Sequence, residues 1–435
     1  MKTSFPESVA VGVLFSTRYW NQADMTDIFM EVQSSLSDYI KEYQKINFEF
    51  YLIKDHESFE KFYYRTKNNP VVLIPMSGGI QPWMLKVGQS AAFTVIVQGY
   101  YNSFFSERVT SCLVEKNAPP ALTDTYAVLK RTGMQVMLAL SIPQIFNNLK
   151  AYLTMIQLRG MSILFAGEPE PWVISSVRTG KEIEERFGIK TLGITLDELQ
   201  SRFYKADPQK VSKIADEWLL KAEETIEPNK DDIYKASALQ QSIFDLMDDY
   251  QADCFCAKCF ELIGKIDTTA CLALSFLNSS DAYCGACEGD LDSAVSLIIM
   301  KKLTGMSPWM ANPIVLEQDK LTLAHCSAPF ENGYDRLTLR SHHESKKGVS
   351  PQVELPVDRT VTIMRIGNHM NNIQFFTGKA LRNPDINTCR TRLQIQVDDL
   401  QSYMEKTLGC HYTMVYGDHT ELLKIFSKLA RLTII

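Results

Sequence analysis

The run Val9-Ala-Val-Gly-Val-Leu-Phe15 gives the clearest indication of the fold class. An unbroken series of apolar and small residues is typical of a strand covered on both faces, as in a parallel sheet. A helical stretch from about Ala23 to Ile46 comes next. Further strands are expected at Phe48–Ile53, Val71–Pro75 and Thr94–Gln98. Strands that alternate with helices indicate βαβ units, so we predict an N-terminal, doubly wound α/β domain over residues 1–140.

The rest of the chain divides into two further predicted domains. Residues 141–305 repeat the alternation, with a helix over Ile142–Leu158 and a strand at Ser162–Ala166, and predict a second doubly wound α/β domain with a parallel sheet. From residue 306 onward short alternating runs separated by turn residues predict a β-rich, antiparallel, barrel-like C-terminal domain, residues 306–435. A helix over Thr420–Leu432 is expected to close the chain.

Composition indicates an ordinary globular protein. The chain has 435 residues, of which 45% are hydrophobic and 22% charged, with a net charge of −6. The negative charge and the lack of a basic cluster argue against a nucleic-acid partner. No apolar run reaches the roughly 18 residues of a membrane span, and the short run after Glu7 lacks a cleavage site, so we expect no membrane partner and a cytoplasmic location. The ten cysteines are expected to be reduced there.

The stretch Ala286-Cys-Glu-Gly-Asp-Leu-Asp-Ser293 is the richest in chemistry. Glu288, Asp290 and Asp292 precede an apolar stretch that predicts an amphipathic helix closed by Gly305. Acidic residues favour helix N-termini, which accounts for Asp290 and for Asp292 as the expected N-cap. That explanation fits Glu288 less well, because its small and cysteine neighbours indicate a strand end.

Two histidines lie on separate predicted strands. His325 ends the run Leu321-Thr-Leu-Ala-His325 and shares a face with its leucines, and His411 lies in a strand-like run before the last helix. Each can be read as a buried core histidine or as a ligand. Together with one carboxylate they would suit Mn²⁺ or a similar divalent ion.

Two other features keep a structural and a functional interpretation open. Cys254, Cys256 and Cys259 with Cys284 and Cys287 have spacings that could supply a structural zinc site, or they are small core residues. The turn Met76-Ser-Gly-Gly79 follows a strand of the first domain. It is either a tight turn that needs glycine or part of a ligand site at the carboxyl edge of the sheet.

The chain resembles the L-fucose/L-arabinose isomerase-like superfamily over nearly its whole length. Ala286–Ala294 with Leu303-Thr-Gly305 resembles the central motif of that family, and Leu323-Ala-His-Cys326 and Gly409-Cys-His-Tyr412 resemble its two histidine motifs. The segments Lys258–Glu261, Gly167–Trp172 and Ser77–Gly79 also resemble the family. The resemblance implies two α/β domains and a β-rich third, and a homo-oligomer, trimer or hexamer, with active sites at subunit interfaces. It also implies Mn²⁺ or another divalent metal, and conversion of an aldose to a ketose through an enediol.

The resemblance also assigns roles to residues. Glu288 would be a metal ligand and the general base, His411 a metal ligand, and His325 a metal ligand or substrate contact. Substrate-binding residues would be Phe260, which packs on the sugar, and Ser77 and Gly79, which line a pocket shared with another subunit.

One position departs from the family pattern. Asn312 stands where the family has a second acidic metal ligand with a catalytic role. Its amide can bind a metal through oxygen but cannot act as a base; Glu317 or Asp319 would be substitutes if the loop is shifted. The primary hypothesis is therefore a metal-dependent aldose–ketose isomerase acting on a free sugar. The alternatives are a diverged sugar-binding or regulatory member without turnover, and an unrelated zinc-stabilised α/β protein. A pentose, a deoxyhexose and an anionic sugar such as sulfoquinovose all remain open as substrates.

Overall fold

The computed structural model describes residues 8–41, 46–99, 106–331, 333–334 and 336–435. These residues fall into two compact units that divide between Leu153 and Thr154. The central and C-terminal segments lie in one unit, so the domain boundaries expected at residues 140 and 305 remain predictions. Among the helices in the described ranges, none has both the length and the apolar character to cross a membrane.

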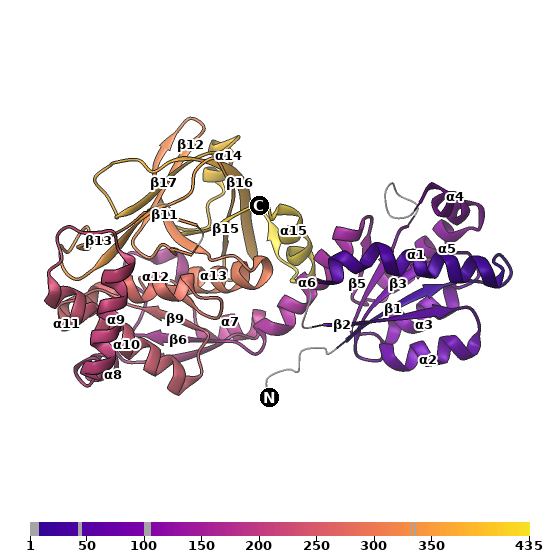
Figure 1. Ribbon diagram of the computed structural model, residues 1–435, viewed down its shortest axis with the longest axis horizontal. Coiled ribbons are helices and arrows are strands. Elements are labelled where there is room, and N and C mark those ends of the chain that lie inside the picture. Colours follow the sequence, from indigo (N-terminus) through magenta and orange to yellow (C-terminus); the bar gives the residue numbers. More distant parts are fainter. Residues whose placement is uncertain (1–7, 42–45, 100–105, 332, 335) are drawn as a thin grey trace. The chain divides into compact units, whose positions relative to one another are not determined.

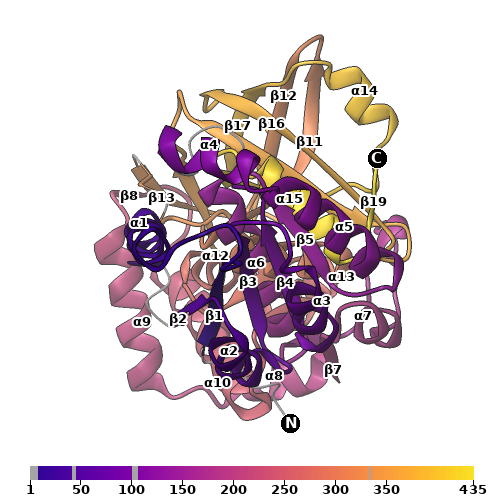
Figure 2. The same cartoon turned by 90° about the vertical axis from the view of Figure 1, so that its right-hand side faces the viewer.

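The N-terminal unit is built on a parallel sheet. Its strands are β1 (Ser8–Leu14), β2 (Asn47–Ile53), β3 (Pro70–Pro75), β4 (Phe93–Val97) and β5 (Val136–Ala139), in the order β2-β1-β3-β4-β5 (Figure 2). Its helices are α1 (Gln22–Lys41), α2 (His56–Thr66), α3 (Gln81–Ser90), α4 (Glu107–Glu115) and α5 (Ala118–Arg131). β1 pairs with β2 and β3, and Val9 to Leu14 are buried, as expected for a strand covered on both faces.

The second unit opens with another parallel sheet, here called the central sheet. It has the order β10-β9-β6-β7, with β6 (Ser162–Ala166), β7 (Lys190–Ile194), β9 (Cys254–Ala257) and β10 (Cys284–Ala286). Figure 1 shows its two middle strands, β9 and β6, side by side. The surrounding helices are α6 (Ile142–Leu158), which spans the division between the units, η1 (Ile174–Ser176), α7 (Gly180–Phe187), α8 (Leu196–Tyr204), α9 (Pro208–Lys221), α10 (Lys230–Tyr250), α11 (Cys259–Ile266), α12 (Cys271–Ser279) and α13 (Leu291–Thr304).

A closed antiparallel barrel of six strands follows. Its order is β15-β18-β11-β12-β17-β16, closed by pairing of β15 with β16. The strands are β11 (Trp309–Glu317), β12 (Lys320–His325), β15 (Thr360–Gly367), β16 (Asn372–Arg382), β17 (Thr391–Gln396) and β18 (Tyr412–Tyr416). β19 (Thr433–Ile434) adds to β16, a small sheet joins β8 (Glu224–Thr225), β13 (Arg336–Arg340) and β14 (Ser350–Glu354), and the last helices are α14 (Leu400–Glu405) and α15 (Thr420–Leu429). The predicted fold class, parallel α/β sheets followed by an antiparallel barrel, is confirmed.

Helix α13 differs from its prediction in two ways. Its N-cap is Asp290, whose side chain accepts a hydrogen bond from the backbone of Ser293, and not Asp292. It is also buried on nearly every side, and not amphipathic, because it packs against β9 and β10 of the central sheet and against β11, β15 and β18 of the barrel. Gly305 ends it in the left-handed conformation, as predicted. The helix thus connects the sheet edge that carries Glu288 to the barrel that carries the histidines.

Candidate active site

A strained turn between β10 and α13 positions Glu288. Glu288 and Gly289 both have positive φ, 59° and 67°, which is uncommon for glutamate. Backbone hydrogen bonds hold the turn, because Glu170 N donates to Glu288 O over 3.0 Å and Gly289 N donates to Ala257 O over 2.8 Å. A Cβ at residue 289 would lie 2.6 Å from Glu168 O, so the close approach requires glycine. The surroundings therefore fix this turn at the carboxyl edge of the central sheet, the edge at which ligands bind in open α/β folds.

The two carboxylate oxygens of Glu288 face different partners. Trp172 Nε1 donates to Oε2 over 2.7 Å, and Oε1 lies 3.5 Å from His411 Nε2. Burial alone would raise the pKa of Glu288, but the nearby His411 imidazole, 3.5 Å away, outweighs it, so the pKa lies below its ordinary value. Glu288 is therefore ionised at neutral pH and can accept a proton or bind a cation.

His411 is held between two carboxylates. Its Nδ1 lies 2.8 Å from Asp290 Oδ2, and its Nε2 is buried without a hydrogen-bond partner, although it faces Glu288. Burial alone would lower the pKa of His411, but its contacts with Asp290, Cys410 and Glu288 raise it well above the usual value. A carboxylate at one ring nitrogen fixes the other toward a metal in many metalloproteins. The arrangement thus aims Nε2 at the space beside Glu288.

His325 lies on the other side of this space. Its ring centre is 5.6 Å from that of His411, and its Nδ1 is 2.9 Å from Ser327 Oγ. Candidate ligand atoms of Cys287, Glu288 and His325 lie within 4.8 Å of one another. Two ligands of one divalent ion are separated by about 3.1 Å at a right angle and about 4.4 Å across it. The 3.5 Å between Glu288 Oε1 and His411 Nε2 is compatible with both atoms binding one ion. The position of His325 is compatible with a role as a metal ligand or as a contact to the substrate.

A buried network of two arginines and two aspartates lies next to His411. Arg365 is fully buried; its Nη1 lies 3.3 Å from Asp290 Oδ2, and its guanidinium also donates to His411 O and Ser176 Oγ. Asp292 pairs with Arg178 over 3.2 Å. Burial opposes ionisation of Asp290, but Arg365 and His411 lower its pKa. Burial and the charge of Asp290 raise the pKa of Asp292 to about 7.

Asn312 lies beside the segment that carries His411. β11 pairs with β18 through Ala311 and Tyr412, and Asn312 Nδ2 donates to Cys410 O over 3.3 Å. The amide nitrogen is thus used by the backbone, and Oδ1 is the atom that can bind a cation. Glu317 is five residues further along β11, about 16 Å away, and pairs with Lys320 at the exposed hairpin end. Neither Glu317 nor the adjoining Asp319 is therefore placed to substitute for Asn312.

An aromatic group borders Glu288. The Phe260 ring meets Trp172 edge-on at 5.1 Å and His342 at 5.6 Å. Phe260 N donates to the buried Glu170 carboxylate over 2.8 Å, and burial raises the pKa of that carboxyl. Phe260 is thus fixed beside Trp172, the tryptophan that donates a hydrogen bond to Glu288.

Ser77 and Gly79 belong to the N-terminal unit. Ser77 is buried and its hydroxyl accepts a hydrogen bond from Ser16 N over 2.9 Å. Gly79 has a φ of 81°, so the turn requires a residue that tolerates the left-handed conformation. The tight-turn interpretation therefore accounts for the local geometry, and a role for both residues in a shared pocket remains a prediction.

The zinc site considered for the clustered cysteines does not form. Cys254 and Cys284 pair on adjacent strands, Cys256 lies on the same strand as Cys254, and the Cys259 and Cys287 thiols are 3.0 Å apart. Within the described ranges, no three of these five thiols lie close enough to share an ion. They fill the core around the central sheet, which is the ordinary behaviour of buried thiols.

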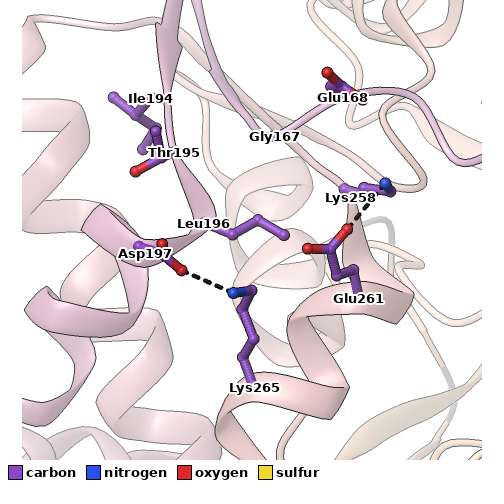
Figure 3. Close-up of a pocket in the computed structure, with 9 residues that line it drawn as sticks. All are labelled: Gly167, Glu168, Ile194, Thr195, Leu196, Asp197, Lys258, Glu261 and Lys265. Atoms are coloured by element: carbon purple, nitrogen blue, oxygen red, sulfur yellow. Dashed lines mark hydrogen bonds and ion pairs between the residues drawn. The ribbon is translucent and has the colours of Figure 1, made fainter.

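A cavity of about 360 Å³ lies at the same edge of the central sheet but is not the predicted centre (Figure 3). Its lining residues are Gly167, Glu168, Ile194, Thr195, Leu196, Asp197, Lys258, Glu261 and Lys265. Both lysines are neutralised, because Lys258 pairs with Glu261 over 2.9 Å and Lys265 with Asp197 over 2.7 Å (Figure 3). The cavity therefore lacks a free cation for an anionic ligand.

Sequence reasoning missed three residues of the site. Asp290 was explained as a helix cap, yet it also orients His411 from 121 positions away. Trp172 was noted only within a family segment, and Arg365 carried no signal within its strand. These roles depend on contacts between distant segments, which spacing within one motif cannot show.

Comparison with known proteins gives the chemical class. No protein-family model matches the chain. The chain is 23% identical to the sulfoquinovose isomerase of Alkalicoccus urumqiensis over 77% of its length and 76% of the relative. It is 22% identical to the sulfoquinovose isomerases of Clostridium sp. strain MSTE9 and Priestia megaterium, over 56% and 61% of this chain and 58% and 62% of those proteins. Similarity to sugar isomerases over most of the chain identifies an enzyme, an aldose–ketose isomerase that acts as an intramolecular oxidoreductase.

Proposed function

We propose that the protein is a metal-dependent aldose–ketose isomerase of the L-fucose/L-arabinose isomerase-like superfamily, acting in the cytoplasm on a free sugar through an enediol. One observation carries the proposal: His411 Nε2 is buried, has no hydrogen-bond partner and lies 3.5 Å from Glu288 Oε1. A buried ring nitrogen without a partner is costly unless something binds it. A divalent ion between the two side chains would satisfy both.

The donor set fits Mn²⁺ or a similar ion. Glu288, His411 and Asn312 would hold it through carboxylate, imidazole and amide atoms, which suit divalent ions of intermediate hardness. His325 would be a fourth ligand or a contact to the sugar. When bound, such an ion polarises the carbonyl and neutralises charge that develops on neighbouring oxygens. Asp290 keeps His411 in the orientation and tautomer that this role needs.

The chain's own residues would move the proton. Glu288 is ionised, so its carboxylate can remove the proton from the carbon next to the carbonyl, which leaves an enediol. The same carboxyl returns the proton to the adjacent carbon while the proton of the neighbouring hydroxyl passes to the former carbonyl oxygen. The carbonyl therefore migrates, and no external oxidant or reductant is needed. Trp172 holds one oxygen of Glu288 and keeps the carboxylate oriented. Phe260 would pack on the apolar face of the sugar.

We further propose sulfoquinovose as the first substrate to test, because the similar isomerases act on that sugar by name. A homo-oligomer in which Ser77 and Gly79 of a neighbouring subunit help to line the pocket is part of the same proposal. Glucose is a matched neutral sugar, because it lacks the sulfonate, and L-fucose and L-arabinose represent the deoxyhexoses and pentoses. If the protein converts only neutral sugars, the proposed isomerase activity stands, but sulfoquinovose is not its substrate.

The test is an isomerisation assay with added Mn²⁺ on the wild type and on Glu288→Gln. The amide cannot accept the proton, so we expect a loss of activity of about 10²- to 10⁴-fold. Glu261→Gln is the matched control, because Glu261 is a half-exposed carboxylate of the same unit that pairs with Lys258 and lies outside the site. Full activity in Glu288→Gln would remove the proposed base. Sugar binding without turnover in the wild type would favour the non-catalytic alternative, which the amide at Asn312 suggests.

A further inference from the structure

A second group of metal-ligand side chains lies near the site but shares no residue with the proposed one. Candidate ligand atoms of Cys271, Cys326 and His342 lie within 4.8 Å of one another, and all three residues are buried. Cys271 is the first residue of α12, Cys326 follows β12, and His342 lies two residues after β13. Three elements far apart in the sequence therefore bring two thiols and an imidazole to one point.

The spacing of the thiols suits a shared ion better than a disulfide. The two sulfur atoms are 3.3 Å apart, whereas a disulfide bond measures about 2.05 Å. Two thiolates on a tetrahedral zinc lie about 3.8 Å apart, from a Zn–S distance of about 2.3 Å. The two sulfur atoms would have to move apart by only about half an ångström to reach that geometry. With these three ligands, a water molecule would complete a tetrahedral zinc site.

Ser345 fixes the ring of His342. The Nδ1 of His342 lies 3.0 Å from Ser345 Oγ and accepts a hydrogen bond from Ser345 N over 3.3 Å, and the ring lies edge-on to Phe260. When a metal binds the other ring nitrogen, the proton would lie on Nδ1 and point to Ser345 Oγ. A partner at one ring nitrogen fixes the ring and leaves the other nitrogen for a ligand role. Thiolates with one imidazole are a soft donor set that selects zinc-like ions over manganese.

We propose that Cys271, Cys326 and His342 bind a thiophilic divalent cation such as Zn²⁺, separate from the cation at Glu288 and His411. The ion joins a helix of the central α/β region to two strands of the C-terminal region. One of its ligands, Cys326, directly follows His325 in the chain. The second cation thus fixes the backbone that presents His325. This inference does not rest on the proposed role of His325.

The test is metal content after loading with Zn²⁺ and gel filtration. Because Zn²⁺ would also bind at Glu288 and His411, zinc is counted in the Glu288→Gln background, to which each further substitution is added. Elemental analysis should find about one zinc per chain in Glu288→Gln, with or without Cys254→Ser. Cys254→Ser is the matched control, because that thiol is equally buried but lies on β9 outside the cluster. Cys271→Ser and Cys326→Ser should each bind at least tenfold less zinc, since hydroxyls are poor zinc ligands. Co²⁺ in place of Zn²⁺ should give near-ultraviolet thiolate-to-metal absorption that both variants lose.

Several results would overturn the proposal. One is a wild type that retains no zinc, and another is equal zinc and cobalt spectra in all variants. Should the serine variants fail to fold, the wild type still decides the matter: removal of zinc by a chelator should expose additional thiols to a thiol reagent. No increase in reactive thiols would count against thiolate ligation. Complete loss of zinc in Glu288→Gln would show that the ion belongs to the catalytic centre and refute a separate site.

Discussion

Replacing Asp290 with asparagine tests whether this carboxylate orients His411. The carboxylate accepts from His411 Nδ1 over 2.8 Å, which keeps the proton on Nδ1 and leaves Nε2 free when a metal binds. An asparagine amide can instead donate to Nδ1, which moves the ring proton to Nε2, the atom that faces Glu288. The substitution thus changes the tautomer while preserving the shape of the side chain.

The expected loss can be estimated from the contacts. Removal of an outer-shell partner of a metal-binding histidine lowers affinity about 10- to 100-fold, or about 1.4 to 2.7 kcal/mol. Folding is affected as well, because Arg365 loses its closer carboxylate. Breaking a buried pair costs about 3 to 5 kcal/mol, but Arg365 keeps Asp292 at 3.9 Å and a hydrogen bond to Ser293. We therefore expect a stability cost of about 1 to 3 kcal/mol.

The assay is calorimetric titration of chelator-treated protein with Mn²⁺, combined with urea unfolding. Asp292→Asn is the matched control, because it removes a carboxylate from the same helical turn and from the same arginine without touching His411. It should keep manganese affinity within about threefold. Equal affinity in the wild type and Asp290→Asn would refute the orienting role, and an equal loss in both variants would assign the effect to general disruption of the buried network.

Three further predictions concern His411, Gly289 and Asp292. Manganese affinity should rise between about pH 6 and pH 8 with release of about one proton per ion, because the raised pKa of His411 means that a metal must displace its proton; a flat profile would contradict this. Gly289→Ala should cost more than about 2 kcal/mol in urea unfolding, because its Cβ would lie 2.6 Å from backbone, whereas Gly305→Ala, with open space around it, should cost about 1 kcal/mol. Since the pKa of Asp292 is raised to about 7, the folded protein holds a proton that the unfolded chain loses at lower pH. The contribution of Asp292 to stability therefore falls as pH rises from about 4 to 7, and the unfolding free energy of Asp292→Asn should improve relative to the wild type over that range.

Strands with a clear apolar pattern could be predicted. Val9–Phe15 matches β1 and Leu321–His325 lies within β12, because burial on one or both faces gives a regular series of apolar residues. β9 has four residues, two of them cysteines, which carry little strand signal, and for β10 only the strand end before Glu288 could be predicted. β11 could not be predicted because it contains Pro313, and proline argues against a central strand. The barrel accommodates this proline at a register shift between Pro313 and Val315.

Only those residues of the candidate site that belong to local sequence motifs could be predicted. Glu288, His325 and His411 belong to local motifs that resemble a family, so they could be named one by one. Asp290 acts on His411 through a contact formed only when α13 packs between the central sheet and the barrel. A helix cap and an orienting carboxylate look the same in sequence, and only the long-range contact separates them.

The turn at Glu288 and Gly289 explains why three acidic residues so close together can have different roles. Two successive residues with positive φ reverse the chain just before α13, so Glu288 projects from the sheet edge toward Trp172 and His411. Asp290 enters the helix as its cap and faces His411 from the other side. Without the turn, these carboxylates would repel one another along one strand or helix face. The strain of a left-handed glutamate is thus consistent with a functional constraint, because it places one carboxylate at the site and another behind the histidine that completes it.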